Sequence, residues 1–138
     1  MPLAPDDPRR QLFGTLGFEK ALDGMSLEEV EAGTATVSIP VSDAVCNMVG
    51  TLHGGAIATL VDVAGTIAIM SQDRDGRPGV TTDLNTSYFS AGRPGETILA
   101  KATALKNGKT LAFVTVDLVE AESGRLLAQG RMTKFMGL

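Results

Sequence analysis

The chain has 138 residues, of which 43% are hydrophobic and 20% are charged, and its formal net charge is -4. This size and balance are typical of one globular domain, so we expect residues 1–138 to form a single domain with a leading segment over about the first 30 residues. The negative charge does not favour nucleic-acid binding, which calls for a basic stripe with interleaved aromatic residues.

The N-terminal ten residues, Met-Pro-Leu-Ala-Pro-Asp-Asp-Pro-Arg-Arg, lack the apolar core of a secretory signal, and their two aspartates disfavour an organellar transit peptide. Cys46 is the only cysteine, which excludes an intramolecular disulfide and suits a reducing compartment. Since there is also a single histidine, we expect no metal site. The expected location is the cytoplasm, with the mitochondrion left open.

The first half of the chain predicts a leading helix, one strand, one loop and one long helix. The leading helix, near residues 10–19, is weakened by Gly14 and Gly17. A strand is expected over 34–40, where β-branched residues partly alternate, and a loop over 43–50. From Gly54 to about residue 71, apolar residues recur at helical spacing and the opposite side is small or apolar, which predicts a helix that is buried nearly all round.

The second half predicts strands separated by turn signals. We expect strands over residues 79–89, 97–105, 111–119 and 126–135. Asn107-Gly108 is a strong signal for a type I′ hairpin turn, which requires positive φ at both central residues. The elements together predict an α+β fold in which an antiparallel meander curves around one long helix.

Asp62 is the only charged residue in the run from Thr51 to Met70, and the single histidine, His53, lies nine positions before it. An unpaired carboxylate in apolar surroundings is costly, so this residue calls for a use or a partner. Two structural explanations exist: the run spans a membrane, or neighbouring hydroxyl and backbone groups satisfy a structural aspartate. The short apolar stretch with a central acid fits a membrane span poorly.

An ordered set of motifs carries a family resemblance over roughly residues 45–137. These motifs are Asn47-Met-Val-Gly-Thr-Leu-His-Gly-Gly55, Leu60-Val-Asp62, Pro78-Gly-Val-Thr-Thr-Asp-Leu-Asn85, Leu105-Lys-Asn-Gly-Lys-Thr-Leu-Ala-Phe113 and Leu127-Ala-Gln-Gly-Arg131. The set resembles hotdog-fold thioesterases of the phenylacetate-pathway (PaaI-like) group, and within them most of all the animal acyl-coenzyme A thioesterases. The resemblance implies a hotdog fold, in which a curved antiparallel sheet wraps a long central helix.

The resemblance also implies the roles of five site residues. Asp62 corresponds to the catalytic carboxylate, and the backbone N–H of Gly54 polarises the thioester carbonyl. Asn47 and His53 shape that half of the site, and Thr81 stands where the animal relatives have a serine that helps to hold water. For each, a structural role is open: Asn47 in its own loop, His53 and Gly54 at helix entry, Thr81 as a β-branched strand residue.

For coenzyme A (CoA), the resemblance points to the segment Lys106-Asn107-Gly108-Lys109-Thr110, with Arg93 and Tyr88 as further contacts. As surface cations the lysines and Arg93 need no ligand to explain them, although phosphates would suit them. Phe135 departs from the animal relatives, which have a histidine there, so it is given no role.

The expected activity is hydrolysis of acyl-CoA, with a tilt toward medium and long acyl chains and Asp62 as general base or nucleophile. No cofactor is expected. The family resemblance implies a site at the interface of a homodimer, and a dimer of dimers. Two rivals are a hotdog hydratase or dehydratase and a non-catalytic acyl-CoA-binding protein.

Overall fold

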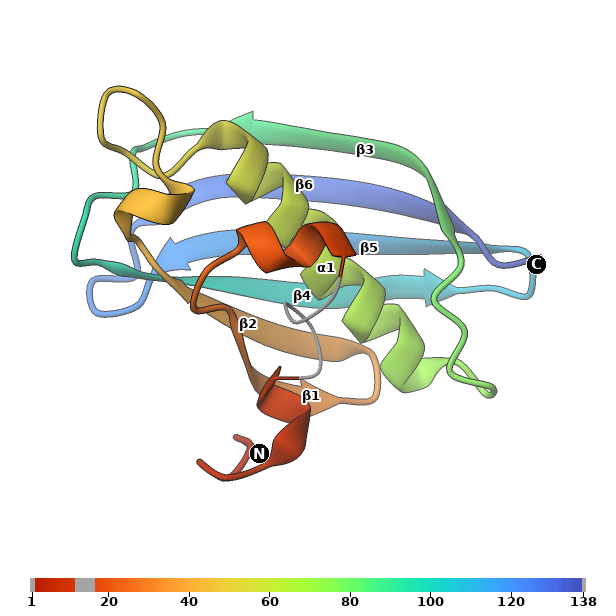
Figure 1. Cartoon of the computed structure of the whole chain (residues 1–138). Helices are drawn as coiled ribbons and strands as arrows, with labels where there is room; N and C mark the ends of the chain where they lie inside the picture. The colour runs from red at the N-terminus through yellow and green to blue at the C-terminus, as the bar shows by residue number, and fades with distance from the viewer. Residues whose placement is uncertain (1, 12–16, 138) are drawn as a thin grey trace.

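The computed structural model describes residues 2–11 and 17–137 of the chain (Figure 1). One long helix, α1 (Gly54–Gln72), lies across one face of a six-stranded antiparallel sheet. The strands are β1 (Ser26–Glu31), β2 (Thr34–Pro40), β3 (Val80–Tyr88), β4 (Thr97–Asn107), β5 (Leu111–Glu120) and β6 (Leu126–Phe135). The predicted α+β architecture, with one long helix on a curved sheet, is therefore confirmed.

The order of strands in the sheet is β1-β2-β4-β5-β6-β3, so the predicted meander holds only for β4, β5 and β6. β3 lies at the far edge and pairs with β6, from Val80 opposite Phe135 to Tyr88 opposite Ala128. The place beside β4 is taken by β2, which forms a hairpin with β1. The helix separates β2 from β3 in the chain and lets them reach different parts of the sheet.

β1 was not predicted, because three glutamates among its six residues obscure the apolar alternation. Leu27 is buried, and a register shift between Leu27 and Glu29 breaks the regular period. The predicted helix near residues 10–19 falls partly on 12–16, which lie outside the described residues. The described parts on either side form short 3₁₀ helices, η1 (Pro8–Gln11) and η2 (Gly17–Ala21), and a third, η3 (Asp43–Val45), lies in the predicted loop.

The hairpin between β4 and β5 is present, but its predicted type I′ turn is wrong. Neither Asn107 nor Gly108 has positive φ, and β4 continues through Asn107 after a register shift between Ala104 and Lys106. The Asn107 side chain turns toward the end of α1 and donates from Nδ2 to the Ile69 carbonyl at 3.4 Å. Gly108 is still needed, because a Cβ there would lie 2.7 Å from the Leu111 oxygen.

The helix α1 has the length and mean hydropathy (1.5) of a membrane span, and half of that apolar window is buried inside the protein. Its buried residues, among them Leu60, Val61, Ala64 and Ala68, belong to the core beneath it. The helix was predicted to be buried nearly all round, and this prediction fails along one stripe. Gly54, Ala58, Asp62, Thr66 and Met70, spaced four residues apart, are each only half-buried.

The end of α1 is closed by a charged cap. Asp73, at the C-cap, pairs with Arg77 at 2.9 Å and accepts the backbone N–H groups of Asp75 and Arg77. These interactions, with the Arg77 side chain contributing most, hold the pKa of Asp73 at about 2, well below its usual range. Arg77 also donates to the Met136 carbonyl at 2.6 Å, which joins the chain after α1 to the segment after β6.

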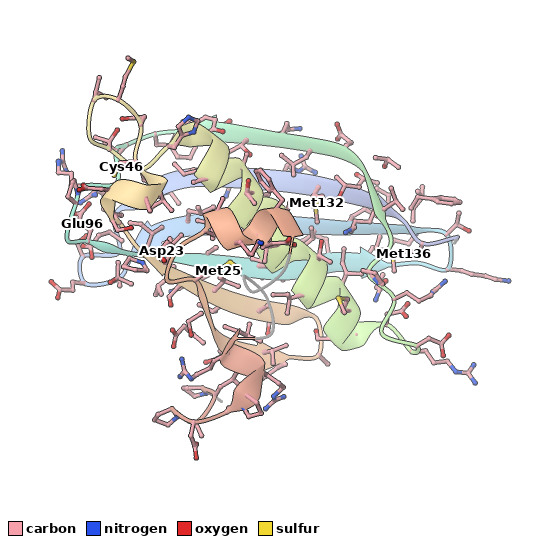
Figure 2. The ribbon with its side chains drawn as sticks, in the orientation of Figure 1. Asp23, Met25, Cys46, Glu96, Met132 and Met136 are labelled. Atoms are coloured by element: carbon pink, nitrogen blue, oxygen red, sulfur yellow. The ribbon has the colours of Figure 1, made fainter. Side chains whose placement is uncertain are left out.

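Close approach between α1 and the sheet depends on glycine. A Cβ at Gly130 of β6 would lie 2.6 Å from both methyl groups of Val61, and one at Gly65 would lie 2.7 Å from the Met132 methyl. Met132 itself is 2% exposed and lies between the sheet and the helix (Figure 2). The helix therefore sits lower on β6 than a sheet with larger residues would allow.

We expect Gly130→Ala to lower the free energy of unfolding by about 1–3 kcal/mol, because the added methyl group overpacks the contact with Val61. Urea unfolding followed by circular dichroism measures this change. The double variant Val61→Ala/Gly130→Ala is the control, since removing the opposing methyl groups should make its loss smaller than the sum of the single losses. An unchanged urea midpoint for Gly130→Ala would contradict the close packing.

Candidate functional site

Asp62 and Thr81, predicted on separate elements, are in direct contact. The Thr81 hydroxyl donates to Asp62 Oδ1 at 2.8 Å, which joins α1 to β3. The other carboxylate oxygen, Oδ2, accepts no hydrogen bond from the described residues and is on the half-buried stripe of α1. The arrangement satisfies half of the carboxylate and leaves the other half open to a water or a substrate.

The N-terminus of α1 holds His53, Gly54 and Tyr88. His53 is the N-cap, and its Nδ1 accepts the Gly55 N–H at 2.8 Å, so its Nε2 carries the proton when the ring is neutral. The Tyr88 hydroxyl donates to the Gly54 carbonyl at 3.0 Å. Among the described residues the Gly54 N–H has no acceptor. A helix N-terminus with a free N–H is suited to stabilise a developing oxyanion.

The side chain of Asn47 forms its hydrogen bonds within its own loop. Its Oδ1 accepts the N–H groups of Val49 and Thr51, both at 3.1 Å, and its Nδ2 donates to Thr51 Oγ1 at 3.0 Å. The tip of that loop is exposed, with Met48 at 99% and Val49 at 78%. Asn47 therefore shapes the approach to α1 through the backbone of residues 47–51, as the structural alternative allowed.

A single chain does not bring Gly54 and Asp62 to one reacting carbonyl. They lie on the same helix, eight positions apart, which corresponds to about 12 Å along the axis. Groups that act on one carbonyl carbon must each approach it to about 3–3.5 Å. The two halves of the predicted site are thus separate within one copy of the chain.

The predicted CoA-contacting residues also fall into two groups, at opposite ends of β4. Arg93 is exposed in the loop next to the N-terminus of α1, where the Leu52 N–H donates to the Gly92 carbonyl at 2.9 Å. Lys106, Lys109 and Thr110 are exposed at the far end, about 35 Å away along the strand. Asn107 points to α1 instead of outward.

Comparison with known proteins identifies the family. Residues 49–132 match the model of the thioesterase superfamily. The mouse protein acyl-coenzyme A thioesterase 13 is 43% identical over 126 residues, which cover 91% of this chain and 89% of the relative. The chain belongs to the thioesterase superfamily.

Solved structures of this superfamily support the same assignment. Zebrafish thioesterase superfamily member 2 is 43% identical, with a TM-score of 0.88 over 93% of this chain and 95% of that one. A hypothetical thioesterase from Streptococcus pneumoniae, solved with coenzyme A, is 26% identical with a TM-score of 0.75 over 82% and 88% of the two chains. The predicted hotdog fold and the predicted family resemblance are both confirmed.

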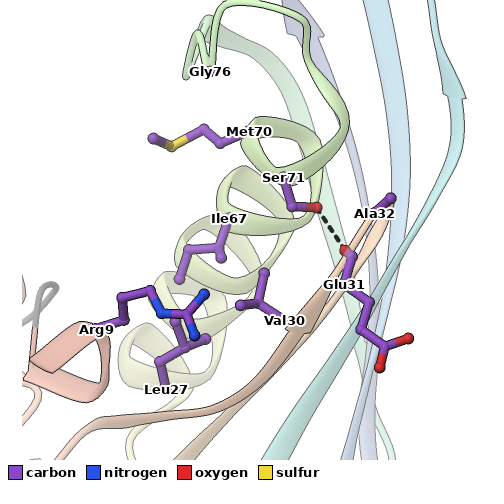
Figure 3. A pocket seen from close by; sticks show the side chains of 9 residues that line it. All are labelled: Arg9, Leu27, Val30, Glu31, Ala32, Ile67, Met70, Ser71 and Gly76. Carbon is purple, nitrogen blue, oxygen red and sulfur yellow. Dashed lines mark hydrogen bonds between the residues drawn. The ribbon is translucent and has the colours of Figure 1, made fainter. Parts of the chain in front are cut away.

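In the described part of this thioesterase-superfamily chain, apolar cavities lie on both sides of α1, and two of them concern the site. One, of about 230 Å³, borders His53 and Gly55 and is walled by Phe18, Leu22 and Val45. The other, of about 370 Å³, lies beside the second half of α1, where Figure 3 shows Ile67, Met70 and Ser71. There Ser71 Oγ donates to the Glu31 carbonyl at 2.8 Å. Asp62 lines neither of these two cavities, but the first adjoins the α1 N-terminus.

Lys134 was missed by sequence reasoning. It is 5% exposed, and its Nζ donates to Thr66 Oγ1 at 2.6 Å, one helical turn beyond Asp62. Burial lowers the pKa of Lys134 below its ordinary value of 10.5, and the charge of Asp62 opposes this in part. The alternation of side chains along a strand could have indicated its position. Because every second side chain faces the same side, Gly130, Met132 and Lys134 lie on one face of β6, and the lysine occupies an inward position.

Proposed function

We propose that this protein is an acyl-coenzyme A thioesterase, which converts acyl-CoA and water into a carboxylic acid and free CoA. The observation that carries the proposal is the Asp62–Thr81 hydrogen bond on the half-buried stripe of α1, in a chain of the thioesterase superfamily. The mouse relative's name and the CoA bound to the Streptococcus pneumoniae structure support acyl-CoA as the substrate.

The proposed mechanism uses Asp62 as a general base. A water held by the open Oδ2 attacks the thioester carbon while its proton passes to the carboxylate. Charge that grows on the carbonyl oxygen is stabilised by the Gly54 N–H and the α1 N-terminus. The carbon–sulfur bond then breaks, and the departing thiolate of CoA takes up the proton that Asp62 accepted, which restores the carboxylate. Direct attack by Asp62, through a mixed anhydride, is the competing route. In single-turnover hydrolysis with ¹⁸O-labelled water, label found in Asp62 would exclude direct attack by water.

The proposed active form is a homodimer in which Asp62 of one subunit faces Gly54, His53 and Asn47 of the other. The separation of about 12 Å within one chain supports this arrangement. β3 offers a means of association, since it is an edge strand of nine residues without proline. A dimer of dimers is proposed as the full assembly.

CoA would then be held by groups from both subunits. Arg93 and Tyr88 lie at the end where the Gly54 N–H is placed, whereas Lys106 and Lys109 lie at the opposite end of β4. In a pair of chains related by a two-fold axis, opposite ends of two subunits can meet at one ligand. Exposed lysine and arginine side chains are suited to the phosphates of CoA.

The proposed acyl group is an aliphatic chain of medium or long length. The cavity of about 230 Å³ supports this, because it adjoins Gly55 and is walled largely by apolar residues. A chain whose carbonyl contacts the Gly54 N–H could extend into this space.

Thiol release from a panel of acyl-CoA substrates, from acetyl to palmitoyl and including phenylacetyl, tests the proposal. We expect turnover that rises with aliphatic chain length to a maximum at medium or long chains. A 2-enoyl-CoA substrate should lose its thiol, whereas hydration without thiol release would identify a hydratase. Tight binding of acyl-CoA with no thiol release across the whole panel would contradict the proposed enzyme.

A further inference from the structure

Four polar residues form a cluster between α1, β3 and β6. Thr81 and Lys134 are directly opposite each other in the β3–β6 pairing. Thr81 donates to Asp62, and Lys134 donates to Thr66, which lies four residues after Asp62 on the same face of α1. The cluster thus joins two hydroxyl groups, one carboxylate and one ammonium.

We propose that Lys134 is a positioning residue of this site, whose buried ammonium is fixed by Thr66 and supplies the positive charge that balances Asp62. The inference rests on the proposed thioesterase function. Lys134 forms no direct ion pair with Asp62 in the described chain. It acts on the carboxylate through the electric field of its charge, and its hydrogen bond to Thr66 holds that charge at the face of α1 that carries Asp62.

If Lys134 had no role at the site, burial of its ammonium would only cost the protein stability. An ammonium has three donors, and the described residues accept one of them, at Thr66. Its neighbours along the inward face of β6, Gly130 and Met132, are small or apolar. Burial of a lysine without a charged neighbour usually costs stability, and its lowered pKa shows that the charged form is disfavoured here.

Among the residues that the structure describes, few charged groups lie on the elements around Lys134. Asp62 is the only charged residue within α1, and Arg131 of β6 is exposed. β3 contributes Asp83, which is exposed beyond the register shift at Thr81. The Asp73–Arg77 pair lies at the end of α1, where Arg77 binds the Met136 carbonyl. Asp62 is accordingly the charge that raises the pKa of Lys134 against the effect of burial.

The coupling can be tested without enzyme activity. In protein labelled with ¹³C at the lysine Cε, the Lys134 signal is identified by its loss in Lys134→Met and followed by NMR as pH rises. We expect the pKa of Lys134 to lie below 10.5 and to fall further in Asp62→Asn, because the raising charge is removed. An equal pKa in both proteins would overturn the coupling, whether or not the protein is a thioesterase.

The positioning role is tested by thiol release over pH 6–10 in Lys134→Met, Lys134→Arg and Thr66→Val, with exposed Lys101→Met as the control. We expect Lys134→Met to lose about one to two orders of magnitude in kcat while thermal stability is kept or raised, since a costly buried charge is removed. Wild-type activity should fall as pH rises through the lowered pKa of Lys134, and Lys134→Met should lack this fall.

Lys134→Arg should keep part of the activity and move the alkaline fall to higher pH, because guanidinium stays charged. Thr66→Val should also reduce kcat, because it removes the group that fixes the Lys134 ammonium. If Lys134→Met does not fold, Thr66→Val alone tests the positioning role. Wild-type rates and pH profiles in both Lys134→Met and Thr66→Val would overturn the proposal. A wild-type protein that releases no thiol would instead contradict the proposed function.

Discussion

Asp62→Asn is expected to lower thiol release by a factor on the order of 10² or more while acyl-CoA binding is retained. The amide keeps the size of the side chain and still offers an oxygen to the Thr81 hydroxyl, which contacts Oδ1 at 2.8 Å. It cannot accept a proton from water or attack the thioester as a carboxylate does. Steady-state thiol release gives the rate, and isothermal titration with a non-hydrolysable acyl-CoA ether gives the affinity.

The matched control is Asp83→Asn, which removes an exposed carboxylate from the same strand that carries Thr81. It should leave the rate nearly unchanged. Thr81→Ala should cost less than Asp62→Asn, and Thr81→Ser, which keeps the hydroxyl, should be nearly silent. A wild-type rate in Asp62→Asn would contradict the role of Asp62 as general base or nucleophile. A wild-type rate in Thr81→Ala would contradict the role of Thr81 in holding water.

Gly54→Pro is expected to lower kcat by about 10²–10³, the cost of one lost oxyanion donor. Proline has no N–H, so the substitution deletes the proposed donor. Gly54 is the first residue of α1, a position where proline is tolerated, and the extended backbone of His53 before it is compatible with proline. Gly54→Ala is the control, because it keeps the N–H and places its Cβ at an ordinary 3.6 Å from the Tyr88 ring.

Co-expression of Gly54→Pro with Asp62→Asn tests whether the two halves come from different subunits. A mixed dimer has one site with both defects and one with neither, so purified mixed dimers should have about half of wild-type activity. Each variant is purified through a different affinity tag, and thiol release is measured on the doubly tagged fraction. If no activity returns in mixed dimers, the shared site is contradicted.

The sequence predicted α1 to within one residue because its helical apolar spacing, the His53 cap and the polar loop after it are all local signals. It missed β1, where glutamates hide the pattern, and it placed β3 beside β4, because strand order depends on contacts between distant residues. The prediction of a type I′ turn at Asn107 was wrong for a similar reason. Its side chain binds the Ile69 carbonyl on α1, an interaction that no pattern around residue 107 could indicate.

For the site, the motifs predicted Asp62 and Thr81, which the structure places in contact across nineteen positions of sequence. The gap between Gly54 and Asp62 was also predictable, because both lie on one predicted helix of known rise. Lys134 was not recognised, since a lysine near the end of a strand is usually solvated. Only the partner strand shows that its inward register position faces Thr81.

The pairing of β3 with β6 has a consequence for synthesis of the protein. Val80 pairs with Phe135, so a strand made early on the ribosome waits until nearly the whole chain has emerged before it finds its neighbour. During this delay β3 exposes unpaired backbone on both sides, which favours association with other nascent chains. Loss of the last ten residues would remove most of this pairing, including the contact of Thr81 with Lys134, and would release the threonine from the vicinity of the helix.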